Sequence, residues 1–362
     1  MISKPITSYS IIVNDFTKSL SLFILRYTKF TSLPLLQQHY KASLKTTNIY
    51  IMRSFLVLMS IACYVHTTKS VAKSEYKSVT IAHQSTYDTL EKVQDTSSKK
   101  GVCITKKAHS SQANWSMKVA SVKPYWHYSW GAEITEYDVK GVDFVPMLWG
   151  RFKKPKLDLV SNYIKDKKVK YVLGFNEPDA KKQANMTVKE AIKMWATLQS
   201  LGVPLGSPAP VDARKQAKDP WLAKFMKKAE GLNYRVDFIC VHSHGGNNAK
   251  YFLDKIDQIY KDYGKPIWIT ELSVSDWKAT SVNNNRFSKK DVLKFMQEVL
   301  PALDKRAYVH RYAWYSPAID NVAGTSSALF DAKGKLTTLG EYYANYKPNL
   351  NAGNGSVIPK SK

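Results

Sequence analysis

The chain has 362 residues and a mass of 41.1 kDa, a length that suits one large domain with extra segments better than one small domain. Hydrophobic residues make up 44% and charged residues 23%, which excludes a collagen-like, low-complexity or wholly disordered protein. The 54 Lys and Arg exceed the 29 Asp and Glu, and the net charge of +25 raises nucleic acid, anionic membranes or acidic polymers as partners. Three cysteines without paired spacing exclude a disulfide framework and a structural zinc site.

The longest apolar run, residues 55–65, is shorter than the roughly 18 residues that a membrane-spanning helix needs. It follows Met52 and a basic residue, and small residues precede a potential cleavage site after Ala72, so we expect residues 52–72 to be a signal peptide and the protein to be secreted. A signal peptide belongs at an N-terminus. We therefore expect residues 1–51 to be a gene-model extension that is absent from the mature protein, the alternative being an acid-poor targeting presequence.

Polar segments flank the main body of the chain. Residues 73–100 are rich in Ser, Thr and Lys and are expected to be a linker, and residues 348–362 are rich in Asn, Gly, Pro and Lys and are expected to be a flexible tail. Outside the signal peptide, Cys103 and Cys240 lie in apolar runs and are expected to be buried free thiols. The mature protein is expected to be a monomer.

Eight short apolar runs, each followed by a stretch compatible with a helix, recur between residues 101 and 347. This βαβ repetition predicts the α/β class and a single (β/α)8 TIM barrel as the one domain. Thr187 and Ser288 are expected to be helix N-caps, the first with Glu190 in a capping box. The predicted strands are 102–105, 119–126, 143–148, 171–175, 204–207, 237–242, 267–270 and 312–315; the predicted helices are 157–166, 187–201, 220–230, 249–263 and 289–303.

Two glutamates end predicted strands. Glu177 follows the fourth strand in Asn176-Glu177-Pro178, and Glu271 follows the seventh in Trp268-Ile269-Thr270-Glu271. In a (β/α)8 barrel the ends of the strands carry the active site, and glycoside cleavage needs two carboxylates, one as acid and one as base or nucleophile. A single such glutamate could equally form an ion pair at the barrel rim, but two at separate strand ends favour catalysis.

Several short motifs follow one another in a fixed order between about residues 101 and 347. They are Gly101-Val102-Cys103-Ile104, Tyr128-Ser129-Trp130-Gly131, Val145-Pro146-Met147-Leu148-Trp149-Gly150, Gly174-Phe175-Asn176-Glu177-Pro178-Asp179, Gly206-Ser207-Pro208-Ala209, the late Glu271 and Tyr312-Ala313-Trp314-Tyr315. In these motifs and their order the chain resembles glycoside hydrolase family 128, within the retaining clan of barrel glycosidases.

This resemblance implies an O-glycosyl hydrolase acting on β-1,3-glucan polysaccharide or oligosaccharide, without a cofactor. It implies that Glu177 is the general acid/base, that Glu271 is the nucleophile, and that Asn176 hydrogen bonds the sugar 2-hydroxyl. At the end of the sixth strand, where the family commonly has His-Trp-Tyr, this chain has His242-Ser243-His244. We expect His242 to keep its place and His244 either to replace the aromatic hydroxyl as a donor or to leave that role unfilled.

Aromatic residues gather at the predicted strand ends. An aromatic ring matches the apolar face of a pyranose, so Tyr128, Trp130, Trp149 and Trp314 are predicted to bind substrate together with the two histidines; the alternative for each ring is a place in the core. Two histidines at alternate positions could also bind zinc, but further ligands are lacking, and we expect no metal.

Three functions remain open at this point. The sequence favours a secreted retaining glycosidase that cleaves β-1,3-glucan by double displacement. The alternative is a non-catalytic β-glucan-binding protein on the same barrel, which the altered sixth strand suggests. The third, a binder of nucleic acid or another polyanion, rests on net charge alone, and we expect no nucleic-acid partner because the lysines fall on outer helix faces and loops. Linkage, chain length and endo or exo action stay open.

Overall fold

The computed structural model describes residues 99–105 and 112–348. The predicted gene-model extension, the signal peptide, almost all of the linker and residues 349–362 of the tail lie outside these described residues. None of the described helices combines the length and the apolar composition needed to cross a membrane.

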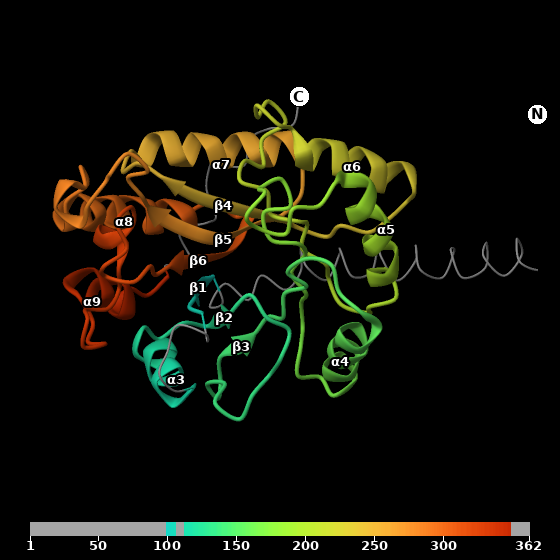
Figure 1. The fold of residues 1–362 in the computed structure, drawn as a ribbon, viewed down its shortest axis with the longest axis horizontal. Helices are drawn as coiled ribbons and strands as arrows, with labels where there is room; N and C mark the ends of the chain where they lie inside the picture. The colour runs from blue at the N-terminus through green and yellow to red at the C-terminus, as the bar shows by residue number, and fades with distance from the viewer. Residues whose placement is uncertain (1–98, 106–111, 349–362) are drawn as a thin grey trace, which may run out of the picture. The chain divides into compact units, whose positions relative to one another are not determined.

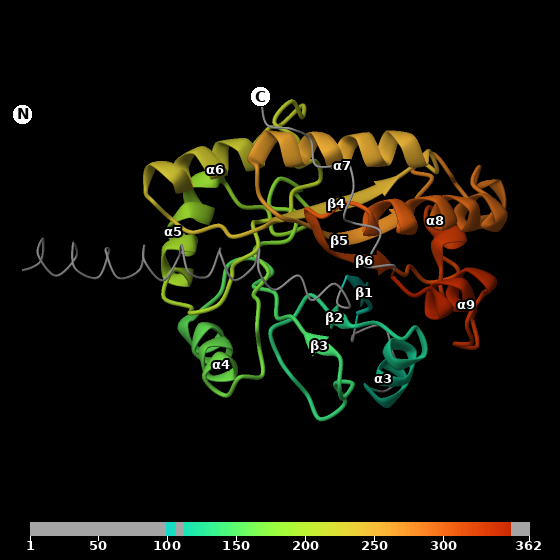
Figure 2. The ribbon, with the colours of Figure 1, turned by 180° about the vertical axis from the view of Figure 1, so that it is seen from behind.

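The described residues form an α/β fold in which every strand pairing of the main sheet is parallel, which confirms the predicted class. The sheet has six strands in the order β3-β2-β1-β6-β5-β4, and helices lie around the outside of these strands (Figures 1 and 2). The strands are β1 (Lys100–Cys103), β2 (Trp126–Tyr128), β3 (Asp143–Phe144), β4 (Ile239–Gly245), β5 (Ile267–Val274) and β6 (Val309–Tyr315). The α-helices are α3 (Gln112–Ser121), α4 (Lys154–Lys165), α5 (Val188–Leu198), α6 (Trp221–Gly231), α7 (Ala249–Tyr263), α8 (Lys289–Asp304) and α9 (Thr338–Asn345).

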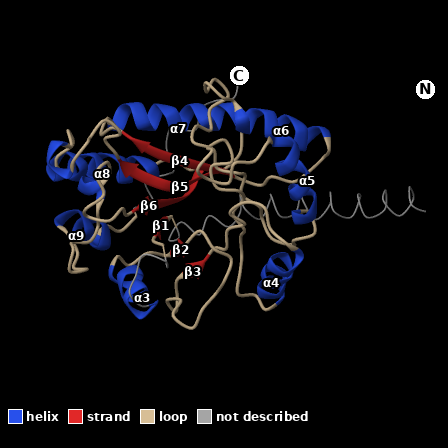
Figure 3. Cartoon of the chain, in the orientation of Figure 1, coloured by secondary structure: helices blue, strands red, loops and turns tan. Residues whose placement is uncertain are grey.

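The fourth and fifth predicted strands, 171–175 and 204–207, are reduced to single parallel bridges. Met147 pairs with Leu173, Val172 with Leu205, and Gly206 with Phe238. Prolines at positions 146, 204 and 208 have no backbone N–H to donate to a ladder, so continuous strands do not form here. Figure 3 accordingly draws no strand arrow between β3 and β4 along the chain. These bridges still lead step by step from the β3 side of the sheet to β4.

Several predicted bounds differ from those observed: β3 ends at Phe144 rather than at residue 148, and β5 continues to Val274 rather than ending at residue 270. Two further differences change how the chain is divided. Residues 119–126 are not one strand, because α3 continues to Ser121 and β2 begins only at Trp126; Trp115, Val119 and Val122 are buried at helical spacing. The linker also ends earlier than residue 100. Lys99 and Lys100 are both buried, and the ammonium groups donate hydrogen bonds to carbonyl oxygens at the C-terminal ends of α8 and α9 respectively.

The predicted helix caps are confirmed. Thr187 and Glu190 form a capping box at the start of α5, and Ser288 caps α8, where Asp291 completes a second box. The bounds predicted for α7 are those observed, since Asn248 caps its first turn and Gly264 ends it in the left-handed conformation. Cys103 and Cys240 are both buried and free, as expected.

Side chains alternate between two apolar clusters along the strands. In β6, Tyr312 and Trp314 belong to the larger cluster, which includes the buried helix side chains, whereas Ala313 belongs to a smaller cluster on the opposite face. Trp268 of β5 also belongs to the smaller cluster and is buried, which agrees with its expected place in the core. The smaller cluster therefore marks the inner face of the strands.

Gly174 should be intolerant of a side chain. A Cβ there would lie 2.8 Å from the carbonyl oxygen of Gly206 and 2.9 Å from the nitrogen of Pro208, and backbone atoms cannot move aside as a flexible side chain can. We expect Gly174→Ala to lower the free energy of unfolding by about 1–3 kcal/mol, measured by denaturant titration. Gly231→Ala is the control, because its added Cβ meets nothing within 4 Å; equal effects of the two substitutions would contradict this account.

Candidate active site

A β-bulge in β5 determines which face Glu271 occupies. Before the bulge, Val241 of β4 pairs with Ile269 of β5; after it, His242 pairs with Glu271, so β5 has one extra residue, Thr270. Trp268 points to the inner face, and uninterrupted alternation would place Thr270 there and Glu271 outside. The extra residue brings the Glu271 side chain onto the same face as His242.

The carboxylate of Glu271 is surrounded by polar groups from β2, from the turn that follows β2, and from β4. Its Oε1 atom accepts from Trp130 Nε1 at 2.8 Å and from the Tyr128 hydroxyl at 3.2 Å, and it lies 3.3 Å from His242 Nε2. Its Oε2 atom lies 2.9 Å from His244 Nε2. Glu271 is only 5% exposed, so these neighbours take the place of water around its charge.

The neighbours keep Glu271 ionised. Burial alone would raise the pKa of this carboxyl, but the two histidines and the Trp130 hydrogen bond outweigh it and lower the pKa to about 2. Glu271 is therefore a carboxylate at any pH at which an enzyme normally works.

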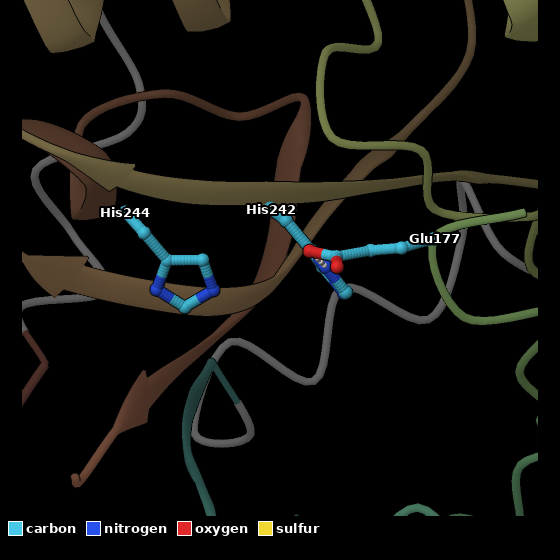
Figure 4. A group of neighbouring side chains, drawn as sticks. All are labelled: Glu177, His242 and His244. Carbon is cyan, nitrogen blue, oxygen red and sulfur yellow. Dashed lines mark hydrogen bonds and ion pairs between the residues drawn. The ribbon is translucent and has the colours of Figure 1, made fainter. Parts of the chain in front are cut away.

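His242 connects the two glutamates. Its Nδ1 atom lies 3.1 Å from Glu177 Oε1, and its Nε2 atom faces Glu271 on the other side of the ring. Figure 4 draws the ring with the Glu177 carboxylate pointing toward it. Burial lowers the pKa of His242, but the charge of Glu271 and the hydrogen bond to Glu177 outweigh this, and the pKa is raised above 6.5. One imidazole thus lies between both carboxylates.

Two residues of the site have strained backbones. Glu177 has φ of +39° and Trp130 has φ of +58°, values that non-glycine residues rarely adopt. Glu177 also precedes Pro178, which restricts its conformation further. Its backbone N–H donates to the carbonyl oxygen of Ala209 at 2.8 Å, which fixes the turn, and its side chain stays 15% exposed. Strain of this kind, of order 1–3 kcal/mol per residue, is concentrated at functional sites.

The remaining predicted site residues divide into those near the carboxylates and those elsewhere. Asn176 is buried next to Glu177, its Nδ2 donates to Gln183 Oε1, and its Oδ1 has no hydrogen-bond partner. Trp149 is 38% exposed, and its carbonyl oxygen accepts from the Asn176 backbone N–H at 2.8 Å. An exposed indole anchored beside Asn176 leaves a ring face open to a ligand.

The structure does not bring Trp314 to the site. It is 1% exposed in the larger cluster, and its indole N–H donates to the carbonyl oxygen of Ser327. Its neighbour Tyr315 lies on the inner face instead, with its ring 5.0 Å from His244 and 5.8 Å from Trp130, measured between ring centroids. The small Ala313 in Tyr312-Ala313-Trp314-Tyr315 is the sequence signal that could have identified the inner face, because residues 313 and 315 share it.

Three of these residues could hold a metal ion. Glu177, His242 and His244 each offer one ligand atom, and these atoms all lie within 4.8 Å of one another (Figure 4). Two imidazoles and a carboxylate form a donor set that suits zinc. One ring nitrogen of each histidine, however, already lies at hydrogen-bond distance from a carboxylate oxygen, His242 Nδ1 from Glu177 and His244 Nε2 from Glu271. The expectation that no metal is needed stays a prediction.

Comparison with protein families identifies the kind of domain that contains this pair of glutamates. The family model described as the glycosyl hydrolase catalytic core matches residues 101–343, which is most of the described chain. The chain belongs to this family. It is a glycosidase, and both the buried Glu271 and the partly exposed Glu177, linked by His242, lie within the matched residues.

Solved structures of glycoside hydrolase family 128 are similar to this glycosidase, which confirms the resemblance seen in the sequence. A subgroup I endo-β-1,3-glucanase from Amycolatopsis mediterranei, in complex with laminaripentaose, is 28% identical with a TM-score of 0.58, and the match covers 68% of this chain and 99% of that chain. A subgroup III curdlan-specific exo-β-1,3-glucanase from Blastomyces gilchristii, in complex with glucose, is 26% identical with a TM-score of 0.54, covering 69% and 99%.

A curated relative is Alkali-sensitive linkage protein 1 of Schizosaccharomyces pombe, 30% identical over 183 residues. The match covers 48% of this glycosidase and 32% of that protein, so the chain corresponds to about a third of the relative's length.

The buried charge of Glu271 should make stability depend on acid pH. Its pKa is about 2 in the folded protein against the usual 4.5, so its contribution is present above about pH 4.5 and is lost as the pH falls through about 2. We expect the difference in unfolding free energy between the unmodified protein and Glu271→Gln to shrink over this range, measured by denaturant unfolding. Glu298→Gln makes the same chemical change on the exposed side of α8 and is the matched control. A difference for Glu271→Gln that stays constant over this range would refute the assignment.

Proposed function

We propose that this glycosidase hydrolyses β-1,3-glucan with retention of anomeric configuration. The observation that carries the proposal is the buried, ionised Glu271, surrounded by donors and linked through His242 to the more exposed Glu177. A retaining mechanism needs this division of roles, with one carboxylate that stays charged to attack and a second that exchanges protons with the leaving group and water. The glucan assignment is supported by the family 128 glucanases that the chain resembles.

In the first step, a Glu271 oxygen attacks the anomeric carbon and the bond to the leaving oxygen breaks. The leaving oxygen takes the proton of Glu177, and a glycosyl ester of Glu271 forms. In the second step, water attacks the same carbon, gives its proton to Glu177, and the Glu271 carboxylate is released. The low pKa of Glu271 makes its carboxylate a good leaving group in this second step.

The substrate is proposed to lie over the inner face, against the aromatic residues. Trp149 presents an exposed indole, and Trp130 and Tyr315 pack edge to face beside Glu271. Asn176 has a buried Oδ1 without a partner next to Glu177, so a sugar hydroxyl can complete its hydrogen bonding. No step needs a cofactor.

The His242-Ser243-His244 segment supports an enzyme over a non-catalytic glucan-binding protein. The change that suggested lost activity leaves a ring nitrogen 2.9 Å from Glu271, so a donor to the nucleophile is retained. Endo and exo action remain alternatives for this chain, since glucanases of both kinds are among the similar structures.

We also propose that the strands close into a (β/α)8 barrel. The parallel bridges from Met147 through Leu173, Val172 and Leu205 to Phe238 support closure, because they lead from the β3 edge of the six-stranded sheet to its β4 edge. Closure places Glu177 and Glu271 at the same end of one barrel.

Removal of each glutamate should have a different kinetic effect. Glu271→Gln is expected to abolish turnover of laminarin and of an aryl β-glucoside or laminarioside alike, because no nucleophile remains. Glu177→Gln should slow laminarin hydrolysis about 10²- to 10⁴-fold. With the aryl leaving group, which needs no proton, Glu177→Gln should still release a rapid burst of phenol, followed by slow release of the sugar.

The controls separate catalysis from folding. Glu298→Gln makes the same chemical change on the exposed side of α8 and should leave both substrates unaffected. NMR of the first product should show the β-anomer before mutarotation. Turnover by Glu271→Gln, or an α-anomer as first product, would overturn the mechanism, and binding of glucan without turnover by the unmodified protein would favour the binding protein.

We further propose that the enzyme is secreted after removal of a signal peptide at residues 52–72. The basic residue, apolar run and small residues before the proposed cleavage site support this. Expression of the full chain in a secreting host should yield protein in the medium whose N-terminal sequence begins after Ala72. A mature N-terminus upstream of Met52, or retention of all activity inside the cell, would contradict it.

A further inference from the structure

Ser273 lies directly behind the histidine that contacts the nucleophile. It is two residues after Glu271 on the same face of β5, and it pairs in register with His244 of β4. Its hydroxyl oxygen lies 2.7 Å from His244 Nδ1, and the other ring nitrogen, Nε2, lies 2.9 Å from Glu271 Oε2. Ser273 is 2% exposed, so water does not compete for this contact.

The ionised Glu271 determines where the proton of His244 must be. A carboxylate can only accept hydrogen bonds, so the ring nitrogen facing it must carry a hydrogen. In a neutral imidazole the other nitrogen, Nδ1, is then an acceptor and needs a donor. The Ser273 hydroxyl is at the right distance to be that donor. Its other hydroxyl neighbour is Ser275, one residue past the end of β5, whose Oγ lies 3.4 Å from Ser273 Oγ.

The hydrogen bond from His244 to Glu271 is important because the two carboxylate oxygens of Glu271 have different numbers of polar neighbours. Oε1 faces Tyr128, Trp130 and His242, whereas the described hydrogen bond to Oε2 comes from His244 alone. With the other tautomer, the lone pair of Nε2 would face the carboxylate and repel it. Oε2 would then lose its donor and the carboxylate would be free to rotate.

We propose that Ser273 is a positioning residue that holds His244 in the tautomer with the proton on Nε2, so that His244 donates to Glu271 Oε2 and orients the nucleophile. This inference rests on the proposed function, in which Glu271 attacks the sugar. Ser273 acts through His244 and does not touch the substrate. The aromatic contacts of the His244 ring with Tyr315 and Trp277 fix its plane. Glu271 requires the proton on Nε2, and the Ser273 hydroxyl stabilises this tautomer by donating to the Nδ1 atom that it leaves without a hydrogen.

The tautomer can be measured without any activity assay. In the full chain labelled with ¹⁵N-histidine, two-bond ¹⁵N–¹H correlation spectra distinguish an imidazole protonated on Nε2 from one protonated on Nδ1. The sequence has 8 histidines, and His244→Asn identifies the His244 signals. We expect the Nε2–H form in the unmodified protein, its loss in Ser273→Ala, and its return in Ser273→Thr, which restores a hydroxyl.

Kinetics should follow the same order. We expect Ser273→Ala to lower kcat on laminarin about 10- to 100-fold, with KM changed less than about twofold. This is the range for loss of a hydrogen bond to a charged group, in this case the bond from His244 to the Glu271 carboxylate. Ser273→Thr should recover most of kcat. Ser275→Ala removes a neighbouring buried hydroxyl whose described side-chain contact is with Ser273 and not with His244, and it should leave the tautomer and kcat unchanged.

The possible failures are distinguishable. If Ser273→Ala keeps the Nε2–H signal and normal kcat while Glu271→Gln is inactive, this inference is wrong and the proposed function stands; if Glu271→Gln is active, the proposed function itself fails. An equal loss of the Nε2–H form and of kcat in Ser275→Ala would show that removal of a nearby buried hydroxyl is enough to produce the effect. The contact of Ser273 with His244 would then not be its cause, and the inference would be overturned. If Ser273→Ala does not fold, by near-ultraviolet circular dichroism, Ser273→Cys keeps the volume with a weaker donor and should show the same two changes.

Discussion

One extra residue in β5 is the constraint on which the site depends. Relative to both neighbouring strands, β5 is one residue longer between Ile269 and Leu272, and this bulge reverses the alternation so that Glu271 and Ser273 face inward. The same shift aligns Glu271 with His242 and Ser273 with His244, which places both imidazoles against β5 residues at hydrogen-bond distance. A regular strand would have directed the glutamate into the cluster that packs against the helices, where its charge would have no partners.

A carboxylate buried as deeply as Glu271 is costly unless other groups replace its hydration, and the penalty is several kcal/mol per ion. The inner face supplies that replacement with an indole, a phenol and two imidazoles, brought from β2 and its following turn and from β4. The left-handed backbone of Trp130 belongs to the same account: strain at one residue directs an N–H at the charge, and the strong hydrogen bond offsets the cost. The rigid packing around the site thus follows from the need to keep one charge buried.

Local sequence signals predicted what local interactions determine. Capping residues gave the start of α5 and α8, and apolar runs before Glu177 and Glu271 drew attention to both carboxylates. The prediction that Glu271 ends its strand was wrong, because β5 continues past it to Val274. Features that depend on register were not predictable in this way. The bulge at Thr270 has no local signature. Trp314 of β6 was predicted to bind substrate because the sequence alone does not show which side chains of this strand face inward. The end of α3 was predicted as part of a strand because Val119, and Val122 just after the helix, are β-branched residues of the kind that strands favour. Ser273 was missed because a serine in a strand has no meaning until the histidine beside it is known.

His242 lies next to a negatively charged carboxylate in both steps of the proposed mechanism. Before reaction the negative charge is on Glu271, and the raised pKa of His242 reflects its position between that charge and Glu177. When Glu271 becomes an ester it loses its charge, but Glu177 has by then given up its proton, so the charge has moved to the other side of the same ring. The imidazole therefore faces one charged carboxylate in either state, from its Nε2 side before the first step and from its Nδ1 side after it. A polar group already in place beside both carboxylates needs little reorganisation between the steps, which is the advantage of placing one histidine between two glutamates.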